Sequence, residues 1–442
     1  MSRIQSYANT PFDHLPDPII SDIFVLIWNS WDLVDEAWGD AHESCIPYVL
    51  AAVSRRWRTI ALSTSKIWTF VDLSFRAEYL ATHLARSKNL RLDVSLALDE
   101  DIRVDLRELL HIFEETDSWA RIGYLDASLD LDRISLLVNA INGATDTNPI
   151  SPFRGISIAT ITRDHGTRIT SGQLNIHIPQ SQTLCRISLD HVTLPLTPDL
   201  PLSPLPGLQH FELKSVEITL PDSLLPFLEL TPNLEHLTLK YCRVRSTPSI
   251  TTSIVRPRHS IALVKLNSLN LLGAEGVAGL NLLFHTLDMP QLRHLTLCTY
   301  SDRPWTHLNW EAVCQSRALR YLVLQGFSSE ALAGLLLHIE LLNQLEGFEL
   351  NHSLLAAPDE FAGQFVRKLL DLSSCPRLSV LIISFPLKDE HTETMKALRH
   401  TRPELYMLVE LDGYGYEDLD IGGEDQLSWV ENEEDYVDNV FY

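Results

Sequence analysis

The chain has 442 residues, a net charge of −23 and a hydrophobic content of 45%, a composition typical of globular proteins. No stretch of 18 apolar residues occurs and residues 1–13 are polar, so we expect neither a membrane span nor a secretory signal. The acidic charge disfavours nucleic-acid binding, because it repels phosphate backbones. Six scattered cysteines without paired spacing fit a reducing compartment and predict a cytoplasmic or nuclear protein.

Residues 12–73 predict a small helical module. It opens with a Leu15-Pro16 turn, and a helix follows whose apolar residues share one stripe: Ile19, Ile20, Ile23, Phe24 and Ile27. A second apolar stretch, residues 46–62, contains Val53-Ser-Arg-Arg-Trp-Arg58 and is followed by Trp68. A module this small has more apolar surface than it can bury alone, which leaves part of that surface for a partner.

The order of these elements resembles the F-box, especially the form common in basidiomycete fungi. The resemblance implies that the module docks onto the Skp adaptor of a Skp–cullin–F-box ubiquitin ligase. The candidate adaptor-binding residues are Leu15, Pro16, Ile19, Ile23, Phe24, Val53 and Trp57. Alternatively several of them, Trp57 foremost, form the helical core. The chain between Phe24 and Val53 is longer than in the compact F-box, and we expect its acidic part to be a solvated loop; folding of this part over the helices would obstruct the adaptor.

Residues 74–183 carry a weaker pattern, interpreted as degenerate early repeats. The apolar spacing predicts strands at residues 90–98, 121–129 and 154–161. Helices are expected near residues 79–87, 105–114 and 131–141, with a loop at 143–152.

Residues 184–411 repeat a leucine-x-x-leucine-x-leucine pattern nine times, with a mean interval of 221/8, or about 28 residues. The first leucines are Leu184, Leu208, Leu234, Leu266, Leu292, Leu319, Leu345, Leu378 and Leu405. A period of this length indicates a solenoid, which offers an extended binding surface.

Within one repeat, Leu237 and Leu239 point to the same side of a short strand, inward, while the residues between them point outward. Helical spacing at residues 329–342 predicts a helix between strands. Five repeats carry a proline two residues before the first leucine, which ends the returning helix: Pro206, Pro232, Pro290, Pro376 and Pro403. Strand, turn and helix together make the leucine-rich repeat unit. The predicted fold class is α/β, a leucine-rich-repeat solenoid (horseshoe) preceded by a small all-α module.

Two features depart from the usual repeat. The asparagine that often holds the turn is absent, so we expect apolar packing to hold the turns. In the ninth repeat Glu410 falls where a core residue belongs, and either the strand slips by one residue or the repeat is a polar cap.

We expect a protein substrate to bind the outward residues of the central strands on the concave face. These candidates are His210, Glu212, Lys214, His236, Thr238, Lys240, His294, Thr296, Tyr321, Gln325, Glu349 and Asn351. His210, His236 and His294 share one register position, and the first two should approach within about 5 Å. They form a metal or pH-sensitive patch, or simply supply polar side chains; the missing ligand set favours the second interpretation, so no metal is predicted.

Residues 412–442 form an acidic, aromatic tail with eleven Asp and Glu and no Lys or Arg. Such a segment is normally solvated. Because the last apolar repeat needs a cover, we expect residues 412–429 to fold back as a cap and residues 430–442 to stay free or to compete for Lys214 and Lys240.

The sequence contains no catalytic or nucleotide-binding motif, so neither enzyme activity nor a cofactor is expected. Two functions remain. The chain is a substrate-recognition adaptor of a ubiquitin ligase, or it is an interaction scaffold with no link to ubiquitination.

Overall fold

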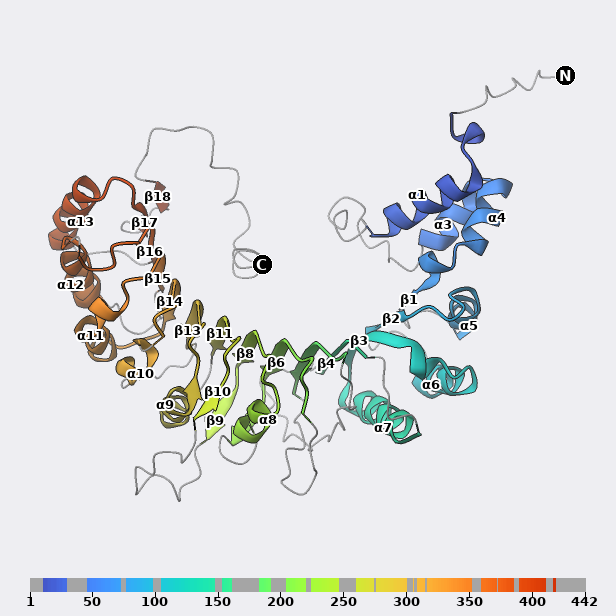
Figure 1. Ribbon diagram of the computed structural model, residues 1–442, viewed down its shortest axis with the longest axis horizontal. Helices are drawn as coiled ribbons and strands as arrows, with labels where there is room; N and C mark the ends of the chain where they lie inside the picture. Colours follow the sequence, from blue (N-terminus) through green and yellow to red (C-terminus); the bar gives the residue numbers. More distant parts are fainter. Residues whose placement is uncertain are drawn as a thin grey trace. The chain divides into compact units, whose positions relative to one another are not determined.

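The structure is a computed structural model of a mixed α/β protein (Figure 1). It describes residues 11–29, 46–72, 77–97, 105–147, 153–160, 183–191, 204–219, 224–245, 260–273, 276–299, 305, 308–314, 316–351, 359–371, 373–384, 389–410 and 416–418. The chain divides into two compact units. Unit 1 comprises Met1–Leu266 with Thr286–Asp288, and unit 2 comprises Asn267–His285 with Met289–Tyr442.

Unit 1 begins with a small helical module. Its elements are the 3-10 turn η1 (Pro11–His14), α1 (Asp17–Asn29), α3 (Ile46–Val53), α4 (Arg55–Ser63) and the 3-10 turn η4 (Ser65–Trp68). Ser54 caps α4, because its side chain accepts a hydrogen bond from the backbone N–H of Trp57 at 3.1 Å. The core of the module contains Ile20, Phe24 and Trp68, all at most 1% exposed. The module therefore has a complete apolar core of its own.

The repeats of unit 1 place their strands in chain order in one parallel sheet. These strands are β1 (Phe70–Asp72), β2 (Leu92–Ala97), β3 (Ile122–Leu129), β4 (Gly155–Thr160), β5 (Arg186–Asp190), β6 (His210–Lys214) and β8 (His236–Lys240). The helices are α5 (Ala77–Arg86), α6 (Leu106–Glu115), α7 (Leu131–Thr147) and α8 (Leu225–Glu229), with the 3-10 turn η5 at Ser118–Arg121. Figure 1 shows α5, α6 and α7 on the same side of their strands. Two short parallel pairs, β7 (Glu217–Thr219) with β9 (Arg243–Arg245) and β10 (Ile261–Ala262) with β12 (Leu287–Asp288), complete the unit.

Unit 2 continues the same construction. Its parallel strands are β11 (Ser268–Leu272), β13 (His294–Cys298), β14 (Tyr321–Gln325), β15 (Gly347–Asn351), β16 (Val380–Ser384) and β17 (Tyr406–Glu410). Its helical elements are α9 (Val277–Thr286), α10 (Trp310–Cys314), α11 (Ser329–Leu337), η7 (Ile339–Leu341), α12 (Asp359–Leu369) and α13 (Asp389–Thr401). The last strand, β18 (Tyr416–Asp418), pairs antiparallel with β17.

The leucine period predicts the register of the repeats. All nine first leucines are buried, and eight of them lie two residues before a strand. In β8 the predicted alternation is confirmed, because Leu237 and Leu239 are 0% exposed and their neighbours are half-buried. Each unit thus has an α/β repeat architecture in which one sheet face packs into the interior and the other carries polar side chains. We call the second face the open face.

The ninth repeat slips by one residue. Leu405 lies one residue before its strand, and the buried Met407 pairs with Leu381 of β16. Of the two alternatives for Glu410, the slip is therefore confirmed. It places Met407 in the interior, where Leu381 stands in the preceding repeat.

The turns after the strands are held by backbone hydrogen bonds in addition to the predicted apolar packing. His191 and Ser215 adopt left-handed backbone conformations directly after β5 and β6. Each donates its backbone N–H to the last residue of the next strand, at 3.0 Å to Lys214 and 2.8 Å to Lys240. Backbone hydrogen bonds between neighbouring repeats thus do the work of the missing asparagine. Apolar packing contributes as predicted, since Cys242 at the ninth position is 0% exposed.

Two predicted helix ends need correction, and one predicted segment lies outside the described residues. Helix α7 extends to Thr147, so residues 143–147 of the predicted loop are helical, and residues 148–152 lie outside the described residues. The helix predicted over residues 329–342 ends at Leu337 and continues as η7. The acidic stretch at residues 30–45 lies outside the described residues. Among the described helices, none combines the length and apolar character needed to cross a bilayer.

Candidate functional site

The helical module exposes apolar side chains although its core is filled. Ile19 and Leu26 of α1 are 46% and 66% exposed, and Val49 and Val53 of α3 are 62% and 59% exposed. Ile19 and Leu26 are seven residues apart, and Val49 and Val53 are four apart, so each pair lies on one face of its helix. An apolar stripe that a small module leaves in solvent is typical of a docking surface.

Arg56 ties the opening turn of the module to α4. Its guanidinium donates to the Asp17 carboxylate at 2.6 and 2.8 Å and to the backbone carbonyl of Leu15. Trp57, the next residue, packs against the buried Phe24 with ring centroids 5.0 Å apart. The Arg-Arg-Trp-Arg segment therefore fixes the Leu-Pro turn beside α1.

The seven candidate adaptor-binding residues fall into three groups. Pro16, Ile19 and Val53 are exposed; Leu15, Ile23 and Trp57 are half-buried. Phe24 is 0% exposed and lies in the core, so it supports the surface from beneath. The sequence interpretation omitted the exposed Leu26 and Val49. Their helical spacing from Ile19 and Val53 was the available signal, but an apolar residue at such spacing is more often core.

Aromatic contacts join the module to the first repeat. The Tyr48 ring lies 5.5 Å from Tyr79 of α5, and the Trp68 ring lies 5.0 Å from the His83 imidazole. The Nδ1 atom of His83 is 3.0 Å from the backbone carbonyl of Phe70. Burial lowers the pKa of His83 to about 4, because the charged imidazole would lose its hydration there. The junction is therefore built around a neutral histidine.

The open face of unit 1 carries charged and imidazole side chains. The rings of His210 and His236 are stacked with centroids 4.4 Å apart and an interplanar angle of 3°, which confirms the predicted approach. Burial lowers the pKa of both imidazoles, and for His210 the neighbouring His236 adds to the effect. Glu212 accepts a hydrogen bond from Ser188 at 2.8 Å and pairs with Lys214 at 3.1 Å.

The open face of unit 2 is more apolar. His294 stacks on Tyr321 at 4.8 Å, and the Tyr321 ring covers Gly347 of the next strand. Asn351 donates a hydrogen bond to Glu349 at 2.6 Å, and burial raises the pKa of that carboxyl group. Between these groups Val323 is 9% exposed. This surface can recognise a partner by shape and a few hydrogen bonds, while the surface of unit 1 offers charge.

All twelve candidate substrate-binding residues lie on the outward register positions of their strands and are half-buried. Eight of them belong to β6, β8 or β14: His210, Glu212, Lys214, His236, Thr238, Lys240, Tyr321 and Gln325. Six of the twelve lie in unit 1 and six in unit 2, so the surface of each unit is described by itself.

Two observations concern the reactive groups of the described residues. Among them, no three His, Cys, Asp or Glu side chains lie close enough to hold a metal ion. Burial raises the pKa of the Cys242, Cys298 and Cys314 thiols to about 12, so these thiols stay protonated and are poor nucleophiles at neutral pH.

Comparisons with known proteins give only distant likenesses. No protein family matches the sequence, and no curated protein matches it either. A solved structure of a protein from Bacteroides fragilis is similar, with 15% identity, coverage of 68% of this chain and 78% of that chain, and a TM-score of 0.35. A TLR13–ssRNA13 complex is also similar, with 14% identity, coverage of 76% of this chain and 52% of that chain, and a TM-score of 0.34. The architecture described above rests on strand order and register rather than on these likenesses.

Proposed function

We propose that the chain is a substrate-recognition adaptor of a Skp–cullin–F-box type ubiquitin ligase. The helical module would dock the Skp adaptor, and the open face of the repeats would hold a protein substrate. The carrying observation is the pair of exposed apolar stripes, Ile19 with Leu26 and Val49 with Val53, on a module whose core is already full. Covering such exposed apolar residues with a partner removes apolar surface from water, which makes the free energy of binding more favourable.

Side-chain contacts connect the module to the first repeat, so a partner bound to the module would be held in a fixed position relative to that repeat. Tyr48 and Trp68 contact Tyr79 and His83 of the first repeat, and Arg86 of α5 lies 5.2 Å from the Trp68 ring centroid. These contacts lie within one compact unit. An adaptor needs such a link, because the substrate must be held near the ligase that the module recruits.

The chemistry of ubiquitin transfer would belong to the partners. This proposal gives the chain itself no catalytic residue, no cofactor and no metal. The second candidate, an interaction scaffold outside ubiquitination, uses the same open face and leaves the apolar stripes to another partner. The repeated outward positions on rigid strands favour protein binding in both cases.

The docking proposal is tested by co-purification of the full chain with a Skp adaptor. We expect Ile19→Asp with Val53→Asp to abolish binding, because two carboxylates would be desolvated in an apolar interface. Leu337→Asp is the matched control, since Leu337 is an 82% exposed leucine of α11 in unit 2. Leu15→Ala with Pro16→Ala should also abolish binding. If circular dichroism shows that the proteins are folded and the adaptor binds neither the unaltered chain nor the Leu337 variant, the result favours an interaction scaffold outside ubiquitination.

The substrate surface is tested separately. Proximity labelling is carried out with the unaltered chain and with a Lys214→Glu, Lys240→Glu variant. We expect the variant to label fewer of the same proteins, because both amines lie on the open face of unit 1. Unchanged recovery would move the binding surface away from β6 and β8. This outcome is independent of adaptor binding, so the two parts of the proposal can fail separately.

A further inference from the structure

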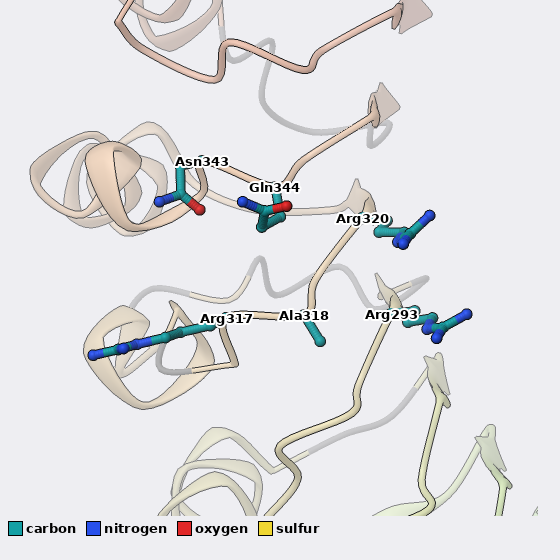
Figure 2. A pocket seen from close by; sticks show the side chains of 6 residues that line it. All are labelled: Arg293, Arg317, Ala318, Arg320, Asn343 and Gln344. Carbon is teal, nitrogen blue, oxygen red and sulfur yellow. The ribbon is translucent and has the colours of Figure 1, made fainter.

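A cleft of about 290 Å3 opens in unit 2, where the chain passes from helix to strand before β14 and β15. It is lined by Arg293, Arg317, Ala318, Arg320, Asn343 and Gln344. Figure 2 shows Arg293 and Arg320 pointing to one side, Arg317 extending to the other, and Asn343 and Gln344 on the turn of the neighbouring repeat. Its charged lining is therefore entirely basic, with the guanidinium groups spread along the cleft. This arrangement suits an extended ligand with several separate anionic groups.

Two of these arginines have no acidic partner among the residues that the structure describes. Arg320 pairs with Glu346 at 3.1 Å, whereas Arg293 and Arg317 are exposed and form no ion pair among the described residues. The protein as a whole carries −23, so an unneutralised basic cleft stands out from its surroundings. An acidic peptide is the complementary ligand, because carboxylates bind guanidinium groups in bidentate geometry.

The chain itself supplies such a peptide. Residues 419–442 contain eight Asp and Glu and no Lys or Arg. This segment follows β18, which runs antiparallel to β17 with Glu410 opposite Tyr416 and Leu408 opposite Asp418. The direction of β18, from Tyr416 to Asp418, is therefore toward the edge at which β17 begins. Arg293 and Arg320 stand immediately before β13 and β14 at that same edge, because strands β13–β17 are parallel.

The distance is short for a segment of this length. Four strand spacings separate β18 from β14 and five separate it from β13, or about 19 and 24 Å at a spacing of about 4.8 Å. The 24 residues after Asp418 (442 − 418) can span about 80 Å when extended. The segment can reach the cleft with most of its length to spare.

We propose that residues 419–442 bind across this arginine cleft as an internal acidic ligand. Their carboxylates would neutralise Arg293 and Arg317, and the amide side chains of Asn343 and Gln344 would donate hydrogen bonds to them. The lysines of the unit 1 open face are weaker competitors, because Lys214 is already paired with Glu212 at 3.1 Å. An external acidic partner would have to displace the tail before it could use the cleft.

Proteolysis of the full chain tests the proposal. Chymotrypsin cleavage after Trp429 and Tyr436, followed by mass spectrometry, reports whether the tail is bound. Each rate is divided by that of a free synthetic peptide of residues 419–442 under the same conditions. We expect the tail of the intact chain to be cleaved several-fold more slowly than the peptide at low salt, and at nearly the same rate in 0.5 M NaCl, because salt screens exposed charges.

Variants locate the contact. Arg293→Glu with Arg317→Glu should speed tail cleavage about fivefold, the size expected from the loss of two exposed ion pairs. Arg293→Lys with Arg317→Lys retains both charges and should preserve most of the protection. Lys214→Glu with Lys240→Glu should have no effect. Equal cleavage of the intact chain and the free peptide overturns the proposal, and so does a release of the tail by the Lys214 and Lys240 pair alone.

Discussion

The two units share one repeat architecture, but each buries a titratable side chain of the opposite kind. In unit 1 the junction with the helical module encloses His83, whose pKa is lowered by burial. In unit 2 the open face encloses Glu349, whose pKa is raised by burial. A buried base favours the folded state at higher pH and a buried acid favours it at lower pH. The repeat backbone therefore leaves pH sensitivity to single side chains.

The ends of the units differ as well. At the first strand of unit 1, Tyr48 and Trp68, which precede the strand, pack against His83, which follows it. The last parallel strand of unit 2 is covered by the three-residue β18, and the loop before β16 is held by the buried Arg402. The aromatic contacts at the start of unit 1 depend on packing and on the protonation of His83. The contacts of Arg402 near the end of unit 2 depend on hydrogen bonds to carbonyl groups. Four predictions test this difference, beginning with the largest effect.

Arg402→Met should destabilise unit 2 by at least about 3 kcal/mol, because it leaves buried carbonyl groups without donors. The guanidinium is 2% exposed and donates to Cys375 at 2.9 Å, to Ser374 at 2.6 Å and to Asp371 at 3.1 Å. Hydrogen–deuterium exchange in α12 and α13 measures the loss. Lys396→Met, an exposed change on α13, should have no comparable effect. Equal protection in the two variants would show that Arg402 does not hold the loop.

Acidification should weaken unit 1. The pKa of His83 is about 4 in the folded chain and about 6.5 when unfolded, so between these values only the unfolded state binds the proton. Stability is complete above pH 6.5 and falls by up to about 3 kcal/mol as the pH drops to 4. Hydrogen exchange in α5 across this range measures it. His83→Phe should flatten the dependence, while the exposed His111→Phe should not; a slope unchanged by His83→Phe would contradict the assignment.

Truncation after Gly413 removes β18 and should lower the melting temperature and raise aggregation, because it uncovers the edge of β17. Truncation after Asp418 keeps β18 and should lose only the smaller contribution of the tail bound to the arginine cleft. The pair separates covering of the strand edge from binding of the acidic tail to the arginine cleft. If both truncations leave melting and monomer content unchanged, β18 contributes nothing to stability.

Glu349→Gln should give the smallest effect, a stabilisation within about 1 kcal/mol at pH 7. The folded pKa of Glu349 is raised above its ordinary value, so the carboxyl group costs stability as the pH rises through that folded pKa. The gain should vanish near pH 4, where the carboxyl group is protonated. Thermal melting at the two pH values, with the exposed Glu330→Gln as control, decides the sign. A loss of stability at pH 7 would show that the hydrogen bond from Asn351 outweighs the burial.

Much of the fold was predictable because the leucine period and the two-residue alternation are direct consequences of strand geometry. These patterns located the strands and the inward side of Leu237 and Leu239. The slip at Leu405 could not be decided, since both registers leave apolar residues available for the interior. The hydrogen bonds that hold the turns were not predicted, because they join backbone atoms, as between His191 and Lys214. Such bonds do not require a particular residue type.

The candidate site was predictable only in part. Alternation along the strands gives the outward positions, so all twelve candidates lie where expected. Leu26 and Val49 were missed, because helical periodicity alone does not tell which apolar stripe a neighbouring helix will cover. The division of the open face between two units depends on long-range packing and has no counterpart in the repeat pattern.

Two glycines of the open face have a consequence for how its specificity can change. A methyl group on Gly155 would lie 2.6 Å from the Tyr124 ring, and one on Gly347 would lie 2.6 Å from the Tyr321 ring. In both places a tyrosine from one strand occupies the space above the next strand. A new side chain at either glycine must first displace that ring, so the two repeats can vary there only as a pair. Libraries that randomise one strand at a time would miss the viable combinations, whereas joint randomisation of Tyr321 with Gly347 would find them.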